Sequence, residues 1–164
     1  MIQQVKRLLT NLRNKKLIGV NIMKTLGLVS CTKRKQPYAC KASEMYQPSD
    51  LFKKAYSYCK KTYDRVAILS AKYGLLYTDD EIEPYDLTLN TMNTQKIFDW
   101  SNKVFSQMQD RFDLNEIETV FFHAGNNYRK YLIPKLETLG IEVKIPLVKL
   151  SLGKQLGWYK KKLE

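Results

Sequence analysis

Residues 24–48 read KTLGLVSCTKRKQPYACKASEMYQP, and this stretch decides how the rest of the chain is interpreted. Its apolar run, residues 26–29, ends abruptly in the polar segment 30–35. An apolar run closed by polar residues is typical of a buried strand, although periodicity alone leaves a buried helix open. Ligands of open α/β sheets bind beyond the carboxyl ends of the strands, so we expect segment 30–35 to lie at a site.

Two more apolar runs, residues 66–69 and 119–122, also end in polar or small residues. A fourth segment, residues 141–147, alternates apolar and charged side chains, which is typical of a strand with one solvated face. Helical patterns follow each run, and such alternation favours parallel strands joined by right-handed crossovers. We predict an α/β fold, a three-layer Rossmann-like domain with a mostly parallel sheet of about four to five strands.

Two intervals between these elements, residues 36–48 and 75–93, are predicted as loops. The first is polar, whereas the second is long and contains many apolar residues, which predicts an ordered loop. Ser49 and Asn93 each precede a helical pattern and are predicted to cap those helices.

The first 22 residues differ from the rest in holding five cations and no acid. Apolar residues at helical spacing lie among these cations. We therefore divide the chain into a basic N-terminal extension, residues 1–22, and a single α/β domain, residues 23–164. Met23 marks either an alternative start or the edge of the domain. The extension could contact nucleic acid or a membrane surface, or it could be a loosely attached segment.

The composition, with 44% hydrophobic and 27% charged residues, indicates a globular protein. The longest apolar runs are too short to cross a bilayer, and no signal peptide is evident, so we expect a cytoplasmic protein. Cys31, Cys40 and Cys59 are an odd number without metal-type spacing, and there is a single histidine. Reduced thiols are the simplest interpretation, and we expect no metal and no cofactor.

The net charge of +12 favours nucleic acid or another polyanion as partner. Phosphate contacts carry no sequence preference, so the charge cannot set one. The sequence also leaves open whether the partner is DNA, RNA or a free nucleotide. A basic protein without such a partner is the alternative. The predicted partner is therefore a nucleic acid or nucleotide and not a membrane, and the oligomeric state stays open.

Four residues are candidate catalysts. Cys31 could be a nucleophile if Lys33 or Lys35 lowers its pKa, and a desolvated Lys35 could itself attack as an amine. Asp86 lies in an otherwise apolar stretch, where burial would suit a general acid or base. His123, the single histidine, ends the third apolar run. The alternatives are a small buried cysteine, a solvated lysine, a turn-forming aspartate and a hydrogen-bonded structural histidine.

A second set of polar residues could bind substrate or phosphate. Gly125 precedes a helical pattern, and a glycine turn at a helix start exposes backbone N–H groups to an anion. Arg129, one turn later, could add a bidentate contact. No dinucleotide-binding or P-loop motif occurs in the chain. The full predicted binding set is Ser30, Lys33, Ser70, Lys72, Tyr85, Gly125, Asn126 and Arg129.

The motifs ILSAKYGLL, residues 68–76, and IEPYDL, residues 82–87, resemble the YaaA-type peroxide-stress proteins. Residues 31–38, CTKRKQPY, are similar to a motif of archaeosine synthases, which modify a deazaguanine base in tRNA. With HAGNNYR at 123–129, the chain most resembles a family of small bacterial and phage proteins without an assigned function, over residues 25–162. The first resemblance implies DNA binding and iron control, and together they imply a nucleic-acid or nucleobase setting.

The residues and the resemblance together predict an enzyme that modifies a nucleobase, nucleoside or nucleic acid by glycosidic-bond or base-modification chemistry. Its pocket would lie at the carboxyl ends of the strands. The alternative is a non-catalytic basic DNA- or RNA-binding protein, with the extension and the last helix holding the backbone. A third interpretation is a protein that binds another protein.

Overall fold

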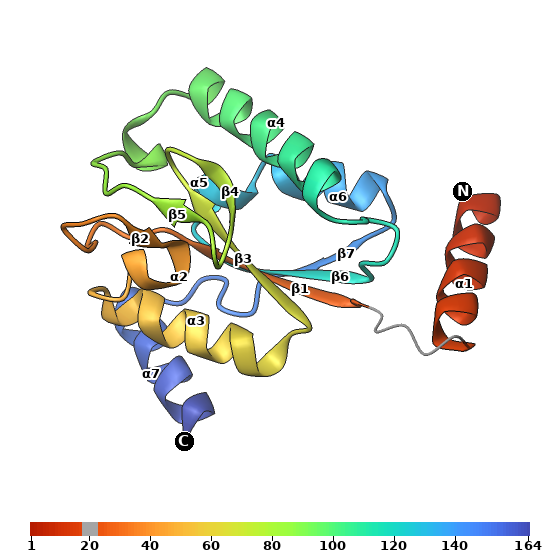
Figure 1. The fold of residues 1–164 in the computed structure, drawn as a ribbon, viewed down its shortest axis with the longest axis horizontal. Coiled ribbons are helices and arrows are strands. Elements are labelled where there is room, and N and C mark those ends of the chain that lie inside the picture. Colours follow the sequence, from red (N-terminus) through yellow and green to blue (C-terminus); the bar gives the residue numbers. More distant parts are fainter. Residues whose placement is uncertain (18–22) are drawn as a thin grey trace.

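The computed structural model describes residues 1–17 and 23–164, and its centre is a twisted sheet with helices on both faces (Figure 1). The sheet has five strands in the described part of the chain, in the order β4-β3-β1-β6-β7. Strand β1 pairs in parallel with β3 and β6, β6 pairs in parallel with β7, and β4 is antiparallel to β3. The strands are β1 Thr25–Ser30, β3 Arg65–Ser70, β4 Gly74–Tyr77, β6 Thr119–His123 and β7 Glu142–Lys144.

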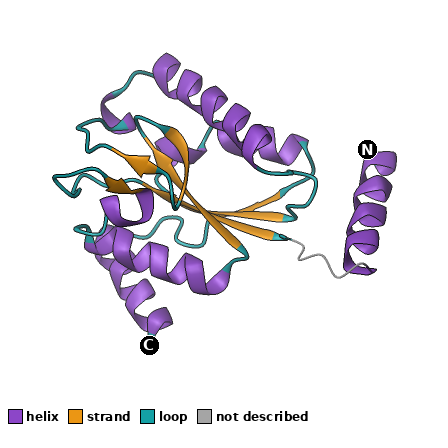
Figure 2. Cartoon of the chain, in the orientation of Figure 1, coloured by secondary structure: helices purple, strands orange, loops and turns teal. Residues whose placement is uncertain are grey.

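Helices cover both faces of this sheet (Figure 2). Helices α3 (Asp50–Thr62) and α7 (Leu152–Leu163) pack against each other on one face. Helices α4 (Thr94–Arg111) and α6 (Leu132–Thr138) pack against each other on the other face, together with the short α5 (Asn126–Arg129). The predicted α/β class with a mostly parallel sheet between helical layers is therefore confirmed.

The predicted caps explain where the two long helices begin. Ser49 Oγ accepts a hydrogen bond from Phe52 N at the start of α3, and Asn93 Oδ1 accepts one from Lys96 N at the start of α4. Each bond satisfies an N–H group that has no partner within its helix. The apolar stripes of both helices lie against the sheet, where Cys59 of α3 is fully buried as a core residue.

The two predicted loops contain regular structure, and this part of the prediction is wrong. Interval 75–93 includes most of β4, a second short strand β5 (Glu81–Ile82) and a 3₁₀ turn (Leu89–Thr91). Interval 36–48 includes β2 (Cys40–Lys41), which pairs with β5, and helix α2 (Ala42–Met45). These elements are so short that their apolar residues show no clear period. Their conformation depends on tertiary packing, which the sequence pattern does not show.

Helix α1 (Ile2–Leu17) precedes the sheet and lies near the amino ends of β1 and β6 (Figure 1). The first strand begins at a well-defined point, because the Asp64 carboxylate accepts hydrogen bonds from Lys24 N and Thr25 N, both at 2.9 Å. Partial burial acts to raise the pKa of Asp64, but these N–H bonds outweigh it and hold the pKa below its usual value. Within residues 1–17 and 23–164, no helix combines the length and apolar character that crossing a membrane requires.

Candidate functional site

The carboxyl ends of β1, β3 and β6 meet at one edge of the sheet, as the strand order requires. Ser30 at the end of β1 is in register with Leu69 of β3, and Val29 is in register with His123 of β6. The polar residues after these strands therefore come together. Their side chains nevertheless divide into a cavity, a partly buried hydroxyl cluster with Lys35 beside it, and three exposed residues.

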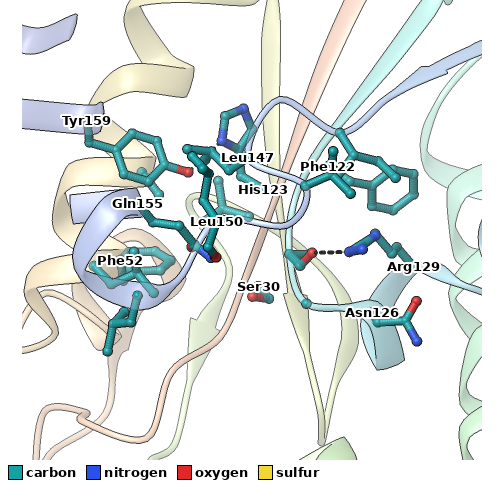
Figure 3. Close-up of a pocket in the computed structure, with 18 of the residues that line it drawn as sticks. Ser30, Phe52, Phe122, His123, Asn126, Arg129, Leu147, Leu150, Gln155 and Tyr159 are labelled. Carbon is teal, nitrogen blue, oxygen red and sulfur yellow. Dashed lines mark hydrogen bonds between the residues drawn. The ribbon is translucent and has the colours of Figure 1, made fainter. Parts of the chain in front are cut away.

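The cavity has a volume of about 360 Å³ and lies between the sheet edge and helices α3 and α7 (Figure 3). Strand ends β1 and β6, helix α5 and the segment 145–150 complete its wall. Part of the wall is apolar and includes Phe52 and Phe122. Five of the predicted site residues line this cavity: Ser30, His123, Gly125, Asn126 and Arg129.

The polar part of the wall favours an anion. Among the described residues that line the cavity, Arg129 and Lys149 are the two cations and none is a carboxylate. The Arg129 guanidinium donates to Ala124 O at 3.1 Å, which holds its charge beside the cavity. Partial burial lowers the pKa of Arg129, yet an arginine keeps its charge at any physiological pH. Lys149 has a left-handed backbone, with φ of 68°.

His123 contributes to the wall as a buried, neutral group. Its Nε2 lies 2.7 Å from Tyr63 Oη and its Nδ1 lies 2.6 Å from Tyr159 Oη. Burial lowers the pKa of His123 to about 4. A neutral imidazole has one donor and one acceptor nitrogen, so one tyrosine accepts from the ring and the other donates to it. His123 thus links β6 to α7 and to the residue after α3. These contacts are those of a hydrogen-bonded structural histidine, the alternative to a catalytic role.

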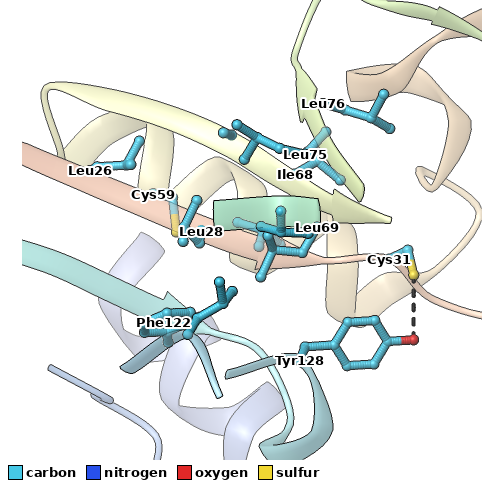
Figure 4. Packing of buried hydrophobic residues seen from close by; sticks show 14 of the residues in the cluster. Leu26, Leu28, Cys31, Cys59, Ile68, Leu69, Leu75, Leu76, Phe122 and Tyr128 are labelled. Carbon is cyan, nitrogen blue, oxygen red and sulfur yellow. Dashed lines mark hydrogen bonds between the residues drawn. The ribbon is translucent and has the colours of Figure 1, made fainter. Parts of the chain in front are cut away.

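The hydroxyl cluster lies beside the cavity and contains Cys31, Ser70 and Tyr85 of the predicted set. Tyr85 Oη lies 2.8 Å from Ser70 Oγ and 2.7 Å from Tyr46 Oη. Cys31 Sγ accepts from Ala71 N at 3.4 Å, and it lies 3.6 Å from the hydroxyl of Tyr128 (Figure 4).

Burial keeps the phenols of this cluster neutral. It raises the pKa of Tyr85 and of Tyr46, and it raises the pKa of Tyr128 to about 12. Lys35, a predicted nucleophile, reaches the cluster from outside, with its Nζ 4.5 Å from the centroid of the Tyr85 ring. The amine also donates to Lys33 O at 3.3 Å.

Replacing Tyr85 with phenylalanine should lower the free energy of unfolding by about 1–2 kcal/mol. The substitution removes two part-buried hydrogen bonds and leaves the Tyr46 hydroxyl without that partner. Tyr38→Phe is the matched control, because the Tyr38 side chain is exposed. Urea unfolding measures both changes. An equal effect of the two substitutions would show that the Tyr85 hydrogen bonds contribute nothing to the free energy of unfolding.

The remaining predicted residues, Lys33, Lys72 and Asp86, are exposed. The expectation that Asp86 is buried is wrong. Its neighbour Tyr85 points into the hydroxyl cluster, which leaves the Asp86 carboxylate on the solvent side. The catalytic and binding roles assigned to these three residues stay predictions.

Thr32, Lys149, Gln155 and Tyr159 also line the cavity and were not among the predicted site residues; Lys149 and Gln155 are the two that follow the fourth predicted strand. Gln155 Nε2 donates to Leu150 O at 2.9 Å, which bridges α7 and the segment before it. Their position in the sequence could have indicated that they belong to the site. Both follow the fourth predicted strand, and the carboxyl end of a parallel strand lies at the same edge as the other three.

Comparison with known proteins identifies the family but no activity. Residues 26–161 match the family described as "Family of unknown function (DUF6884)". One solved structure, that of AF0587, a protein of unknown function, is similar with 17% sequence identity and a TM-score of 0.43. The similarity covers 85% of this chain and 43% of that chain, so the chain spans less than half the length of that protein. No curated protein matches the sequence. The chain belongs to the DUF6884 family, whose function is unknown.

Proposed function

We propose that the chain binds a phosphorylated nucleoside in the cavity between the sheet edge and helices α3 and α7. The observation that carries the proposal is the wall of the cavity, which has two cations, no carboxylate among its described residues, and an apolar part. Arg129 and Lys149 would hold the phosphate, the first through a fork of N–H donors and the second as a point charge. The hydroxyl of Ser30 and the amide of Asn126 would add neutral hydrogen bonds.

The apolar part of the wall argues for an organic ligand and not for phosphate alone. Phe52, Leu147 and Leu150 line the same cavity as the cations, and such a combination suits a ligand with one charged end and one apolar end. The volume of about 360 Å³ lies at the lower end of the range for small-molecule pockets, which extends from about 300 to 1,000 Å³. A mononucleotide is a ligand of this size and character.

A nucleobase-modifying enzyme would need chemistry beyond binding. The resemblances to YaaA-type proteins and to archaeosine synthases support a nucleic acid or a nucleobase as the ligand. Strand β1 directs Ser30 to the cavity and Cys31 to the hydroxyl cluster, so the proposed binding residues and the predicted nucleophile lie on opposite sides of one strand end. The catalytic roles of Cys31, Lys35, Asp86 and His123 stay predictions from the sequence.

Substitution of Arg129 tests the binding proposal. We expect mononucleotides at millimolar concentration to raise the melting temperature, because a ligand of the folded state stabilises it by mass action. Arg129→Gln should weaken that binding about tenfold to a hundredfold, which corresponds to the loss of a hydrogen bond to a charged group. Lys149→Gln should also weaken mononucleotide binding. Glutamine is similar in size to lysine and keeps a side chain at this left-handed position.

Arg34→Gln is the matched control, because Arg34 is exposed and does not line the cavity. Calorimetric titration of each variant gives the dissociation constants directly. The proposal fails if no mononucleotide or nucleoside phosphate binds, or if Arg129→Gln and Arg34→Gln bind one equally well.

A further inference from the structure

Positive charge is distributed unequally between the two faces of the sheet. Helices α3 and α7 together hold eight lysines and one acid, a net charge of +7. Helices α4 and α6 on the other face hold four cations and three acids, a net charge of +1. More than half of the net charge of +12 therefore belongs to one helical layer.

Seven of these eight lysines are exposed, on two helices of one layer that together present an outer surface. The Tyr58 ring of α3 packs on Trp158 of α7, with ring centroids 4.9 Å apart, so the two helices lie side by side. The one acid, Asp50, is already paired with Lys54 at 2.6 Å. We call this surface the α3–α7 face, and its lysines are Lys53, Lys54, Lys60, Lys61, Lys154, Lys160, Lys161 and Lys162.

The cavity lies between the same two helices. Phe52 of α3 and Gln155 of α7 line it, and each has a lysine of the α3–α7 face as its direct neighbour in the chain, Lys53 and Lys154. Both of these lysines are exposed. A ligand in the cavity would therefore have further cations beside it along both helices.

We infer that a single-stranded nucleic acid runs along the α3–α7 face and places one unpaired nucleotide in the cavity. This inference rests on the proposed function and names its substrate class. A mononucleotide needs only the two cations in the cavity, whereas a row of lysines matches the repeated phosphates of a strand. Lysines are point charges, so they hold the backbone without selecting a sequence.

The size of the cavity favours a single strand over a duplex. Its volume of about 360 Å³ admits one nucleotide, and a base can enter such a pocket only when it is unpaired and unstacked. A single strand meets this condition at little cost, while a duplex must first be opened.

An anionic lipid surface fits the α3–α7 face less well. A helix that lies on a membrane inserts an apolar face between the lipids. Here Tyr159 of α7 is buried, and Trp158 packs against Tyr58 of α3. Leu152 is exposed, but the other apolar residues of α7 are at least partly buried, so what the α3–α7 face offers to a partner is chiefly charge.

The test compares two triple variants of the full chain. One replaces three lysines of the α3–α7 face with glutamine, and the matched control replaces three lysines of α4 and α6. The variants are K61Q/K154Q/K161Q and K96Q/K103Q/K135Q. Fluorescence anisotropy with labelled single strands of about 15 nucleotides, DNA and RNA, measures binding at several salt concentrations. Calorimetry measures mononucleotide binding by the same proteins.

We expect the first variant to bind the single strand about a hundredfold more weakly at about 0.1 M salt. Its log–log salt dependence should lose about 2 from its slope, since each phosphate contact on a single strand contributes about 0.7. The control variant should stay within about twofold of the native protein, and mononucleotide affinity should be unchanged in both. Arg129→Gln should weaken strand binding as well, because one nucleotide occupies the cavity.

Four results would overturn the inference. Two of them are an equal loss of strand affinity in both triple variants and single strands that bind no tighter than a mononucleotide. The other two are a strand affinity that Arg129→Gln does not change and displacement of the strand by phosphatidylserine vesicles. If mononucleotides still bind in an Arg129-dependent manner, only the strand inference fails. If no mononucleotide binds, the proposed function fails with it.

Discussion

Lowering the pH from 6.5 to about 4 should reduce the free energy of unfolding by about 3 kcal/mol through His123 alone. Burial lowers the pKa of this imidazole from 6.5 to about 4 in the folded state. Above pH 6.5 both states hold a neutral imidazole, and the histidine adds no pH dependence. Between the two pKa values the unfolded chain binds a proton that the folded chain excludes, so stability falls with pH at about 1.4 kcal/mol per unit.

Urea unfolding at several pH values between about 5 and 6.5 measures this slope, because carboxylates titrate lower, near pH 4. The chain has one histidine, so its imidazole resonance in an NMR titration gives the pKa of His123 without assignment. The control is His123→Gln, in which the slope in this window should flatten whatever the baseline stability. A folded-state pKa near 6.5 would contradict the prediction.

The sheet could be predicted from the sequence because its three inner strands are simple apolar runs. Residues 26–29, 66–69 and 119–122 became β1, β3 and β6, and each strand end lies within one residue of the predicted end. Burial on both faces selects such runs, and the intervening helices force the strands to be parallel. The meeting of three strand ends at one edge follows from that topology.

The direction of the side chains at this edge could not be predicted. Ser30 lines the cavity, while its neighbour Cys31 turns to Tyr128 and Ala71 in the hydroxyl cluster. The difference depends on where the chain after β3 places Tyr85, and that placement depends on the short strands β4 and β5. Their apolar residues have no clear period, so the sequence pattern could not show them.

The contribution of the C-terminal segment to the cavity was also hidden. Segment 145–150 and the first turns of α7 form one wall, although the predicted site stopped at Arg129. This wall depends on α7 packing on α3 through Tyr58 and Trp158. Such a contact between elements about a hundred residues apart has no local signature in the sequence.

Replacing Gly27 with alanine should lower the free energy of unfolding by about 3 kcal/mol. A Cβ at this position of β1 would lie 2.5 Å from Tyr63 Cδ2 and 3.3 Å from Cys59 Cβ. Strand β1 cannot withdraw, because it is paired on both sides with β3 and β6. Forcing an extra methyl group into a packed core costs about 1–3 kcal/mol, and a rigid neighbour places this case at the upper end.

The Tyr63 ring cannot move away without breaking other contacts. It stacks on Phe121, with centroids 4.3 Å apart, and its hydroxyl holds His123 Nε2. Gly157→Ala in α7 is the matched control, because a Cβ there meets no atom within 4 Å. In a helix that change should stabilise the protein by about 0.5–1 kcal/mol. Urea unfolding of the two variants should therefore give shifts of opposite sign.

The two stability predictions are linked through Tyr63. If the alanine methyl displaces the tyrosine ring, His123 loses the partner of Nε2 and gains access to solvent. Its pKa should then rise from about 4 toward the ordinary value of 6.5, and the pH dependence of stability between these values should shrink. An NMR titration of the single imidazole in Gly27→Ala measures this shift. An unchanged pKa together with a loss of about 3 kcal/mol would mean that the ring stays and β1 moves, and the expectation that β1 cannot withdraw would then be wrong.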